Sequence, residues 1–176
     1  NIGIIGAGKV GFTLGKFFSQ GGIKITGYYS RNPESARQAA AFTDSSFYDN
    51  LEKLIEDSDA IFITVPDRAI TEVYRQISRY EINDKYICHC SGAMSSGDAF
   101  PDIEKTGAHG FSIHPLFPIS SKFEAYRELS DAFFCLEGEA EYLPEFEDVL
   151  RKLGCRTQRI EAENQILYHA ACAMAS

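Results

Sequence analysis

The fold is decided by the stretch Asn1-Ile2-Gly3-Ile4-Ile5-Gly6-Ala7-Gly8-Lys9-Val10-Gly11. A short apolar run ends at a glycine, and three glycines follow with the spacing G-x-G-x-x-G. A helical pattern begins at once, with Leu14, Phe17 and Phe18 on one face. A strand, a glycine turn and a helix in this order are typical of the site that binds the pyrophosphate of a dinucleotide.

Each glycine of this motif has an expected steric role. Gly6 allows the tight turn, Gly8 lets the backbone approach the phosphates, and Gly11 lets the helix pack close to the strand. The helix N-terminus offers N–H groups and the positive end of its dipole to the anion. A purely structural glycine turn is the alternative interpretation.

The composition indicates a globular protein without nucleic-acid or membrane partners. The chain has 176 residues, 44% of them apolar and 24% charged, with a formal net charge of −8. No basic tract is present for nucleic acid or an anionic surface, and no apolar run approaches the ~20 residues of a membrane span. Since a signal-peptide pattern is also lacking, we expect a cytoplasmic protein. We expect no metal site and read the five cysteines, Cys88, Cys90, Cys135, Cys155 and Cys172, as buried reduced thiols.

The remaining sequence alternates between strand and helix patterns. We predict an α/β fold: a Rossmann-type, doubly wound, mostly parallel sheet over residues 1–161. Residues 162–176 are expected to begin a helical C-terminal domain, of which the sequence holds only the first helix. The sixth strand is expected to end at Ile113, broken by His114-Pro115. Further strands are expected over 23–29, 46–48, 59–65, 86–90, 132–136 and 156–160, and further helices over 34–42, 51–55, 67–77 and 142–153.

The end of the second strand indicates which nicotinamide cofactor binds. An acidic residue about 20 positions after the glycines would hold the ribose 2′-hydroxyl of NAD. Here Ser30 and Arg31 occupy that region, and no carboxylate occurs before Glu34. A hydroxyl and a guanidinium suit a 2′-phosphate, so the sequence predicts NADP. An ordinary solvated arginine at a helix start is the alternative.

Ligands bind an open α/β sheet at the carboxyl ends of its strands, and three such ends carry candidate residues. Val65-Pro66 and Ser91 would flank the nicotinamide half, where Ser91 could hydrogen-bond a carboxamide or a substrate oxygen. His114 is the candidate acid or substrate-binding group, because imidazole titrates near neutrality. Ser91 and His114 could equally be satisfied structural residues. His89 lies within a strand and is expected to be structural.

Six segments of the sequence together resemble one family: Gly6-Ala7-Gly8-Lys9-Val10-Gly11, Tyr29-Ser30-Arg31, Val65-Pro66-Asp67, His89-Cys90-Ser91-Gly92-Ala93, His114-Pro115-Leu116 and Tyr168-His169-Ala170-Ala171. It is the family of NADP-dependent oxidoreductases in which a Rossmann-like domain precedes a helical C-terminal domain of unknown function. This family is similar to pyrroline-5-carboxylate reductase, to deazaflavin-dependent NADP oxidoreductase, and to the 6-phosphogluconate and 3-hydroxyacid dehydrogenases. The glycine motif is shared by many families, whereas the last three segments are more specific.

The resemblance implies a homodimer formed through the helical C-terminal domain, with the cofactor cleft between the domains. The hydroxyacid dehydrogenases use a lysine on the helix that here carries Asn164-Gln165, so a lysine-dependent dehydrogenation is not expected. The candidate catalytic residues are Ser91, His114 and His169. The candidate cofactor-binding residues are Gly6, Ala7, Gly8, Lys9, Val10, Gly11, Ser30, Arg31, Val65, Pro66 and Ser91.

The sequence thus predicts an NADP(H)-dependent oxidoreductase that moves hydride to or from a small C=O or C=N substrate. An imine, as in pyrroline-5-carboxylate reductase, needs less help from a protein acid and fits the missing lysine. Two alternatives stay open at this point. One is a non-catalytic NADP-binding sensor or scaffold, and the other is a Rossmann protein that binds another nucleotide or S-adenosylmethionine.

Overall fold

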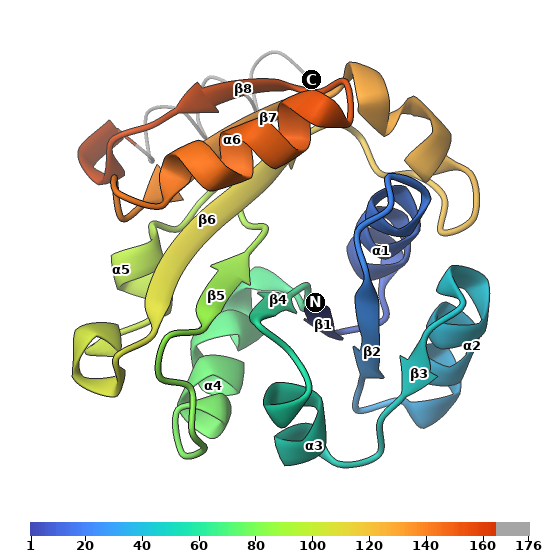
Figure 1. Cartoon of the computed structure of the whole chain (residues 1–176), viewed down its shortest axis with the longest axis horizontal. Coiled ribbons are helices and arrows are strands. Elements are labelled where there is room, and N and C mark those ends of the chain that lie inside the picture. The colour runs from blue at the N-terminus through green and yellow to red at the C-terminus, as the bar shows by residue number, and fades with distance from the viewer. Residues whose placement is uncertain (165–176) are drawn as a thin grey trace.

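The computed structural model describes residues 1–164, and within them one sheet of eight strands forms the centre of the molecule (Figure 1). The strand order is β3-β2-β1-β4-β5-β6-β7-β8, parallel throughout except that β7 runs antiparallel to β6. The predicted Rossmann-type sheet is therefore confirmed. The strands are β1 (Ile2–Ile5), β2 (Ile25–Tyr29), β3 (Ser46–Phe47), β4 (Ala60–Ile63), β5 (Tyr86–His89), β6 (His109–Leu116), β7 (Phe133–Gly138) and β8 (Arg156–Arg159).

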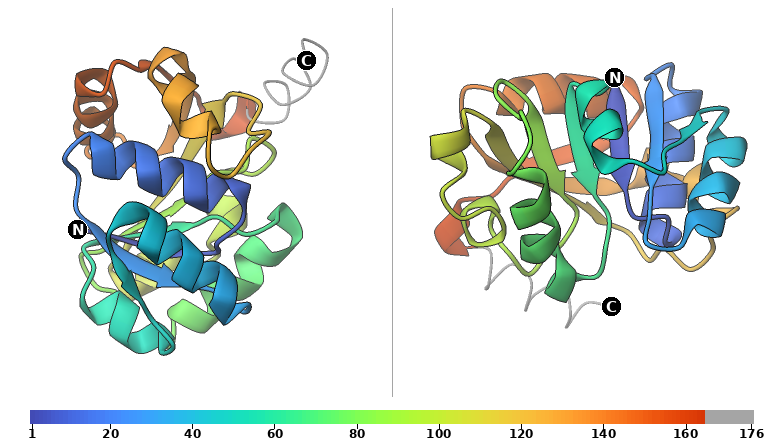
Figure 2. Two further views of the ribbon diagram at one scale, coloured as in Figure 1. Left: turned by 90° about the vertical axis from the view of Figure 1, so that its right-hand side faces the viewer. Right: turned by 90° about the horizontal axis from the view of Figure 1, so that it is seen from below.

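Helices cover both faces of the sheet, as two further views of the ribbon show (Figure 2). Alternate residues of the central strands enter two separate cores: Ile4 and Phe62 pack with one, Ile5 and Ile63 with the other. Burial on both faces explains the near-continuous apolar run of β4. The first core is covered by α1 (Lys9–Gln20), α2 (Pro33–Thr43) and α6 (Leu143–Lys152), the second by α3 (Leu51–Glu56), α4 (Asp67–Ile77) and α5 (Ser96–Ala99).

Local sequence signals set the ends of α2. The Asn32 side chain accepts hydrogen bonds from the backbone N–H groups of Glu34 and Ser35, and Pro33 occupies the first helical position. This is the capping chemistry that satisfies unpaired amides at a helix start. Asp44 ends the helix in the left-handed conformation, with φ of 53°. Helix α2 therefore begins beside Ser30 and Arg31.

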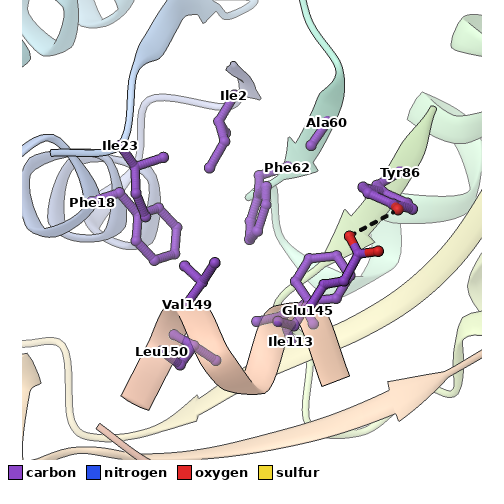
Figure 3. A pocket seen from close by; sticks show the side chains of 11 residues that line it. Ile2, Phe18, Ile23, Ala60, Phe62, Tyr86, Ile113, Glu145, Val149 and Leu150 are labelled. Carbon is purple, nitrogen blue, oxygen red and sulfur yellow. Dashed lines mark hydrogen bonds between the residues drawn. The ribbon is translucent and has the colours of Figure 1, made fainter. Parts of the chain in front are cut away.

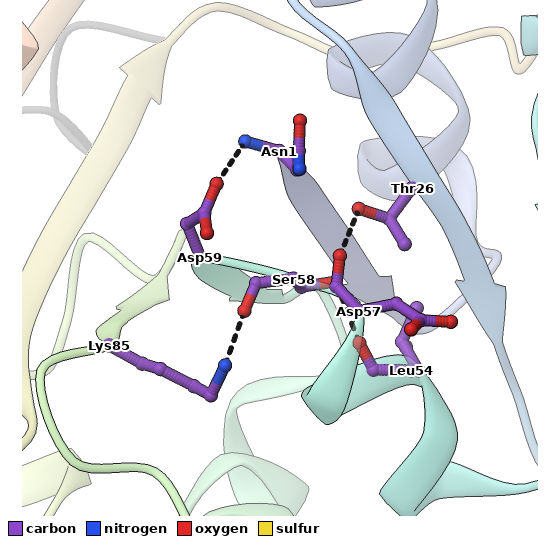
Figure 4. Close-up of polar contacts among 7 residues, drawn as sticks. All are labelled: Asn1, Thr26, Leu54, Asp57, Ser58, Asp59 and Lys85. Atoms are coloured by element: carbon purple, nitrogen blue, oxygen red, sulfur yellow. Dashed lines mark hydrogen bonds and ion pairs between the residues drawn. The ribbon is translucent and has the colours of Figure 1, made fainter.

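Polar contacts tie the amino ends of the strands to the turn between α3 and β4 (Figure 4). The Ser58 hydroxyl donates to the carbonyl of Leu54 at 2.7 Å, and the Lys85 ammonium donates to the carbonyl of Ser58 at 2.6 Å. Thr26 on β2 donates to the carbonyl of Asp57 at 3.4 Å. The bonds to Leu54 and Asp57 satisfy carbonyl groups at the end of α3, and the bond from Lys85 satisfies a carbonyl of the turn that follows.

Strand β6 corrects one expectation. It does not end at Ile113 but continues through His114 and Pro115 to Leu116, paired with β7 along its whole second half. Its pairing with β5 ends at Ser112, so beyond that residue β6 has a strand neighbour on one side. A strand accepts a proline where the missing N–H faces a side without a neighbour. His114 is consequently a strand residue and not a loop residue.

The C-terminal expectations fall largely outside the described residues. Residues Ala162–Asn164 form a short 3-10 turn, and two further 3-10 turns cover Ile103–Thr106 and Ala125–Asp131. The expected helix over 163–176, the domain that it would begin, and His169 lie outside the described residues beyond that turn. In the part of the chain that the structure describes, every helix is too short or too polar to cross a bilayer.

Helix α1 packs against β2 through Gly15. Tyr28 on β2 is fully buried, and its hydroxyl donates to the carbonyl of Gly11 at 3.3 Å. Burial raises the pKa of the Tyr28 hydroxyl, which therefore stays protonated. A Cβ at Gly15 would collide with this hydroxyl, so the helix needs a glycine where it crosses the ring.

Gly15→Ala should lower the free energy of unfolding. The methyl group gains about 1 kcal/mol of helix propensity, but the collision with the Tyr28 hydroxyl places the overpacking cost at about 2–3 kcal/mol, the upper part of its usual range. We expect a net loss of about 1–2 kcal/mol in urea denaturation. Gly97→Ala is the control, because a Cβ there meets no heavy atom nearer than 3.9 Å. A Gly15→Ala variant as stable as Gly97→Ala would contradict the packing described.

Candidate cofactor site

The strand register brings the carboxyl ends of four strands, β1, β2, β4 and β5, to one edge of the sheet. Ile5, Ile63, His89 and Ser112 lie in one row across β1, β4, β5 and β6, and Tyr29 of β2 pairs with Ile5. The residues that follow β1, β2, β4 and β5 therefore emerge side by side, whereas β6 continues past Ser112 to Leu116. Strands β2 and β4 lie on opposite sides of β1, so the order of the strands in the sheet reverses at β1. Open α/β sheets bind their ligands at such a point.

A cavity of about 260 Å³ opens at this edge. It brings together most of the residues predicted to bind the cofactor, and Lys9, Val10, Gly11, Ser91 and His114 are not part of its lining. Helix α4 adds Glu72, Val73 and Gln76, which the sequence analysis did not single out. The predicted residues in the lining are Gly6, Ala7, Gly8, Ser30, Arg31, Val65 and Pro66.

The three glycines of the loop differ in their surroundings. Gly6 has φ of +108°, a conformation that favours glycine, and a Cβ there would lie 3.0 Å from the backbone of Thr64. A Cβ at Gly11 would collide with the carbonyl oxygen of Gly6, so only glycine lets α1 begin this close to the sheet. At Gly8, by contrast, a Cβ would meet no heavy atom within 4 Å. The open space of the loop is therefore at Gly8.

The space at Gly8 suits a bound phosphate. Gly8 is the N-cap of α1 and provides no capping side chain, and the first turn of α1 contains no acidic residue. The first amides of a helix have no partner inside the helix, and their dipoles attract anions. The residues present thus fit the pyrophosphate of a dinucleotide.

Thr64 fastens the glycine loop to the next strand. It directly follows β4, is 8% exposed, and donates its hydroxyl to the carbonyl of Gly6 at 2.9 Å, with the Ile5 carbonyl at 3.3 Å. The sequence analysis missed this residue. The signal in the sequence was the hydroxyl of Thr64 directly after the apolar run 60–63. That signal is weak, because threonine and other β-branched residues are common in strands.

Arg31 brings a positive charge to the cavity at the end of β2. Arg31 is exposed at the cavity, directly before the N-terminus of α2. Ser30 accepts a hydrogen bond from the Asn32 amide at 3.3 Å, and Ser35 on α2 also lines the cavity. A guanidinium, hydroxyl groups and a helix N-terminus together can bind an anion.

Side chains of β5 and β6 hold the loop that follows β5. His89 accepts from the Ser91 amide at 3.2 Å, and Ser112 donates to the carbonyl of Ser91 at 3.2 Å. His114 contacts the carbonyl of Cys90 through Nδ1 at 3.0 Å, and the Ser91 hydroxyl accepts from the amide of Ala93 at 3.1 Å. The backbone of Ser91 is thus fixed from two strands.

His89 and His114 differ in their chemistry. Burial lowers the pKa of His89 to about 4, so this ring stays neutral. His114 is half-buried, and a Cβ at Gly92 would lie 2.7 Å from its Nε2. Because a carbonyl only accepts hydrogen bonds, Nδ1 of His114 must carry a proton.

The cysteines do not form a metal site among the described residues. Cys88 and Cys90 pack toward one core and His89 toward Phe100 on the other face, which is the separation expected of a strand. No group of three or more His, Cys, Asp or Glu residues in the described part of the chain could hold a metal ion. Cys88, Cys90 and Cys155 form no disulfide among the described residues, and burial raises the pKa of Cys90 to about 12.

A second cavity, of about 180 Å³, lies at the amino ends of the strands (Figure 3). Its walls are apolar and include Phe18, Phe62 and Val149, while the Tyr86 hydroxyl donates to Glu145 at 3.1 Å beside it. The glycine loop is at the opposite ends of these strands. This cavity is therefore separate from the candidate site.

Comparisons with known proteins identify the family of the chain. A family model described as NADP oxidoreductase, coenzyme F420-dependent, matches residues 1–91, from the glycine loop to Ser91. A search of the curated proteins found no match. The match to the family model covers more than half of the chain.

Solved structures share the fold. A Bacteroides fragilis protein described as an NADP oxidoreductase has a TM-score of 0.83 at 20% identity, over 99% of this chain and 65% of its own. A Thermotoga maritima protein has a TM-score of 0.72 at 28% identity, over 100% and 63%. An imine reductase of Bacillus cereus has a TM-score of 0.75 at 14% identity, over 98% and 59%. The chain thus spans less than two thirds of each of these structures.

Thr64→Val should weaken the glycine loop while keeping the shape of the side chain. The variant leaves the buried carbonyl of Gly6 without its hydroxyl donor, so we expect the free energy of unfolding to fall by about 1–3 kcal/mol. Affinity for a dinucleotide should fall as well. Thr64→Ser keeps the hydroxyl, so it should retain most of the free energy of unfolding and most of the dinucleotide affinity. Urea denaturation and binding titrations measure the two quantities. Equal behaviour of the two variants would show that the hydroxyl does not hold the loop.

Proposed function

This chain belongs to the family of coenzyme F420-dependent NADP oxidoreductases, and from that premise we propose that it moves hydride between NADP(H) and a small C=O or C=N substrate. The observation that carries the proposal is the cavity where the glycine loop, Ser30-Arg31 and Val65-Pro66 converge. A bound nicotinamide supplies the hydride chemistry. The residues of this chain bind and orient the cofactor and exclude water.

The preference for NADP rests on the charge at the end of β2. Arg31, Ser30 and the N-terminus of α2 offer a guanidinium, a hydroxyl and amides to a 2′-phosphate. Glu34, the first carboxylate after β2, is exposed and lies 3.9 Å from Arg37 and 3.3 Å from Gln38. The Glu34 carboxylate is therefore directed along α2. The charge that remains at the end of β2 is that of Arg31, which favours a phosphate.

Ser91 and His114 are the proposed catalytic residues, together with His169 beyond the described residues. Ser91 accepts from the Ala93 amide, so its own O–H can donate to a carboxamide or substrate oxygen. The Cys90 carbonyl accepts from Nδ1–H of His114, and this ring is the proposed acid for the nitrogen or oxygen of the reduced product. In this proposal Ser91 is the hydrogen-bond donor and His114 is the acid.

An imine is the substrate class that we favour. Reduction of a C=N bond needs little help from a protein acid, and Asn164-Gln165 stand where the hydroxyacid dehydrogenases carry a lysine. The fold shared with an imine reductase is in keeping with this choice. A pyrroline-5-carboxylate-like cyclic imine is the specific compound class proposed. A deazaflavin, which the family description suggests, is the other hydride partner to test.

The proposed assembly is a cytoplasmic homodimer. In this proposal residues 1–161 form the cofactor domain, and residues from 162 onward begin a helical domain that joins two copies. The cofactor cleft would then lie between the two domains. Size measurement of the full-length protein in solution tests the assembly independently of the reaction.

The proposed reaction is tested by thermal unfolding and turnover together. A ligand that binds only the native state raises its stability with the logarithm of ligand concentration over Kd. NADPH should raise the unfolding temperature more than NADH or S-adenosylmethionine, and NADPH should be consumed with a cyclic imine, a carbonyl compound or a deazaflavin. NADPH binding without turnover would favour the sensor or scaffold alternative, and stabilisation by S-adenosylmethionine alone would refute the proposal.

Arg31→Ala should weaken NADPH binding far more than NADH binding. Loss of a charged hydrogen-bond partner costs about 1.5–3 kcal/mol, or roughly 10- to 150-fold in the Kd for NADPH. Isothermal titration with both cofactors measures the difference. Arg79→Ala is the control, since Arg79 is exposed and outside the cavity. Equal losses for the two cofactors with Arg31→Ala would refute the 2′-phosphate role.

Gly8→Leu should abolish dinucleotide binding without unfolding the protein. The new side chain enters open space, so stability should change little, yet it would occupy the proposed phosphate position. Titration of NADPH and urea denaturation measure the two effects separately. Unchanged affinity would rule out the pyrophosphate site at this loop.

A further inference from the structure

The loop after β5 is held at both of its ends. Its first residues, Cys90 and Ser91, are fixed by His89, Ser112 and His114. Its far end enters α5 at Ser96, which donates its backbone N–H at 2.6 Å and its hydroxyl at 2.9 Å to the carboxylate of Glu137 on β7. Both oxygens of that carboxylate are used by this one residue.

Glu137 is a costly residue to bury. It is 7% exposed, and in the described part of the chain no lysine, arginine or histidine forms an ion pair with it. Burial raises the pKa of its carboxyl and nearby Asp98 adds to this, while the bonds from Ser96 oppose it. A buried charge without a cation destabilises a protein unless hydrogen bonds compensate. Here both of its hydrogen bonds go to a single loop.

The register places Glu137 where it can hold this loop. Glu137 pairs with Ser112, Ser112 with His89, and His89 with Ile63, the last residue of β4. Directly paired residues point to the same face of a sheet, so Glu137 shares a face with Ser112 and His89. The loop crosses this face, and its Gly92 lies against the ring of His114.

We infer that Glu137 is a positioning residue: its carboxylate holds the far end of the loop 91–96 and so keeps Ser91 and the ring of His114 in place. This inference rests on the proposed function, in which Ser91 and His114 flank the reacting atoms. Glu137 itself contacts neither of them. Its effect reaches the reaction through Ser96 and the backbone of the loop.

The test compares Glu137→Gln with Glu147→Gln in the full-length protein. Glu147 is also a buried carboxylate, but it lies on α6 and pairs with Arg159 at 2.9 Å, away from the loop. Glu137→Gln should lower kcat on the order of 10- to 100-fold, since small displacements of catalytic groups have effects of this size. The Kd for NADPH should stay close to that of the wild type, because Arg31 and the glycine loop are untouched. Amide hydrogen exchange in residues 91–96 should become faster.

The Glu147→Gln variant should be less stable than the wild type. Its kcat and the amide hydrogen exchange of residues 91–96 should stay unchanged. Ser96→Ala, which keeps the N–H bond to Glu137, should show a smaller effect of the same kind and carries the test if Glu137→Gln does not fold. Unchanged exchange in residues 91–96 with both variants would overturn the inference. If the wild type binds NADPH but reduces no substrate, the proposed function fails, and the exchange measurement alone decides whether Glu137 holds the loop.

Discussion

The close approach of α1 to the sheet is the constraint on which the cofactor site depends. The helix begins so near β1 that a Cβ at Gly11 would collide with the carbonyl of Gly6. That contact directs the first amides of α1 toward the space at Gly8, and Thr64 fixes the opposite side of the loop by a bond to the same carbonyl. Backbone geometry, and not any charged side chain, forms this half of the site.

In the other half of the candidate site, side chains hold the loop after β5 by hydrogen bonds. His89, Ser112, His114 and Glu137 come from three strands, and each binds a backbone atom or the hydroxyl of the loop after β5. Hydrogen bonds in a region of low dielectric are strong, and unpaired groups there are costly, so the loop has few alternative conformations. A loop of small residues that would otherwise be mobile is thereby made rigid beside the proposed nicotinamide position.

Sequence patterns predicted the fold and several residues that line the candidate cavity, because their signals are local. The glycine spacing, Ser30-Arg31 and the apolar run of β4 each depend on residues adjacent in sequence. Thr64, Glu137 and the course of β6 depend on which strands become neighbours. In the sequence, Glu137 lies between Leu136 and Gly138, as a glutamate at a solvent-exposed strand end also would. Only the structure, in which Glu137 pairs with Ser112, shows that it is buried. Pro115 indicated a break because the sequence does not reveal that β6 has lost one neighbour there.

The antiparallel direction of β7 connects these features. Because β7 runs against β6, its start pairs with the extended end of β6, Phe133 opposite Leu116, and its end brings Glu137 back to the row where β4 and β5 finish. One strand thus both extends the sheet past the site and returns a carboxylate to the loop. It also keeps His114 on a paired strand, opposite Cys135, where the backbone has little freedom. Groups on paired strands are positioned more rigidly than groups on loops. The antiparallel direction of β7 therefore pairs the strand segment that carries His114 and places Glu137 against the far end of the loop that carries Ser91.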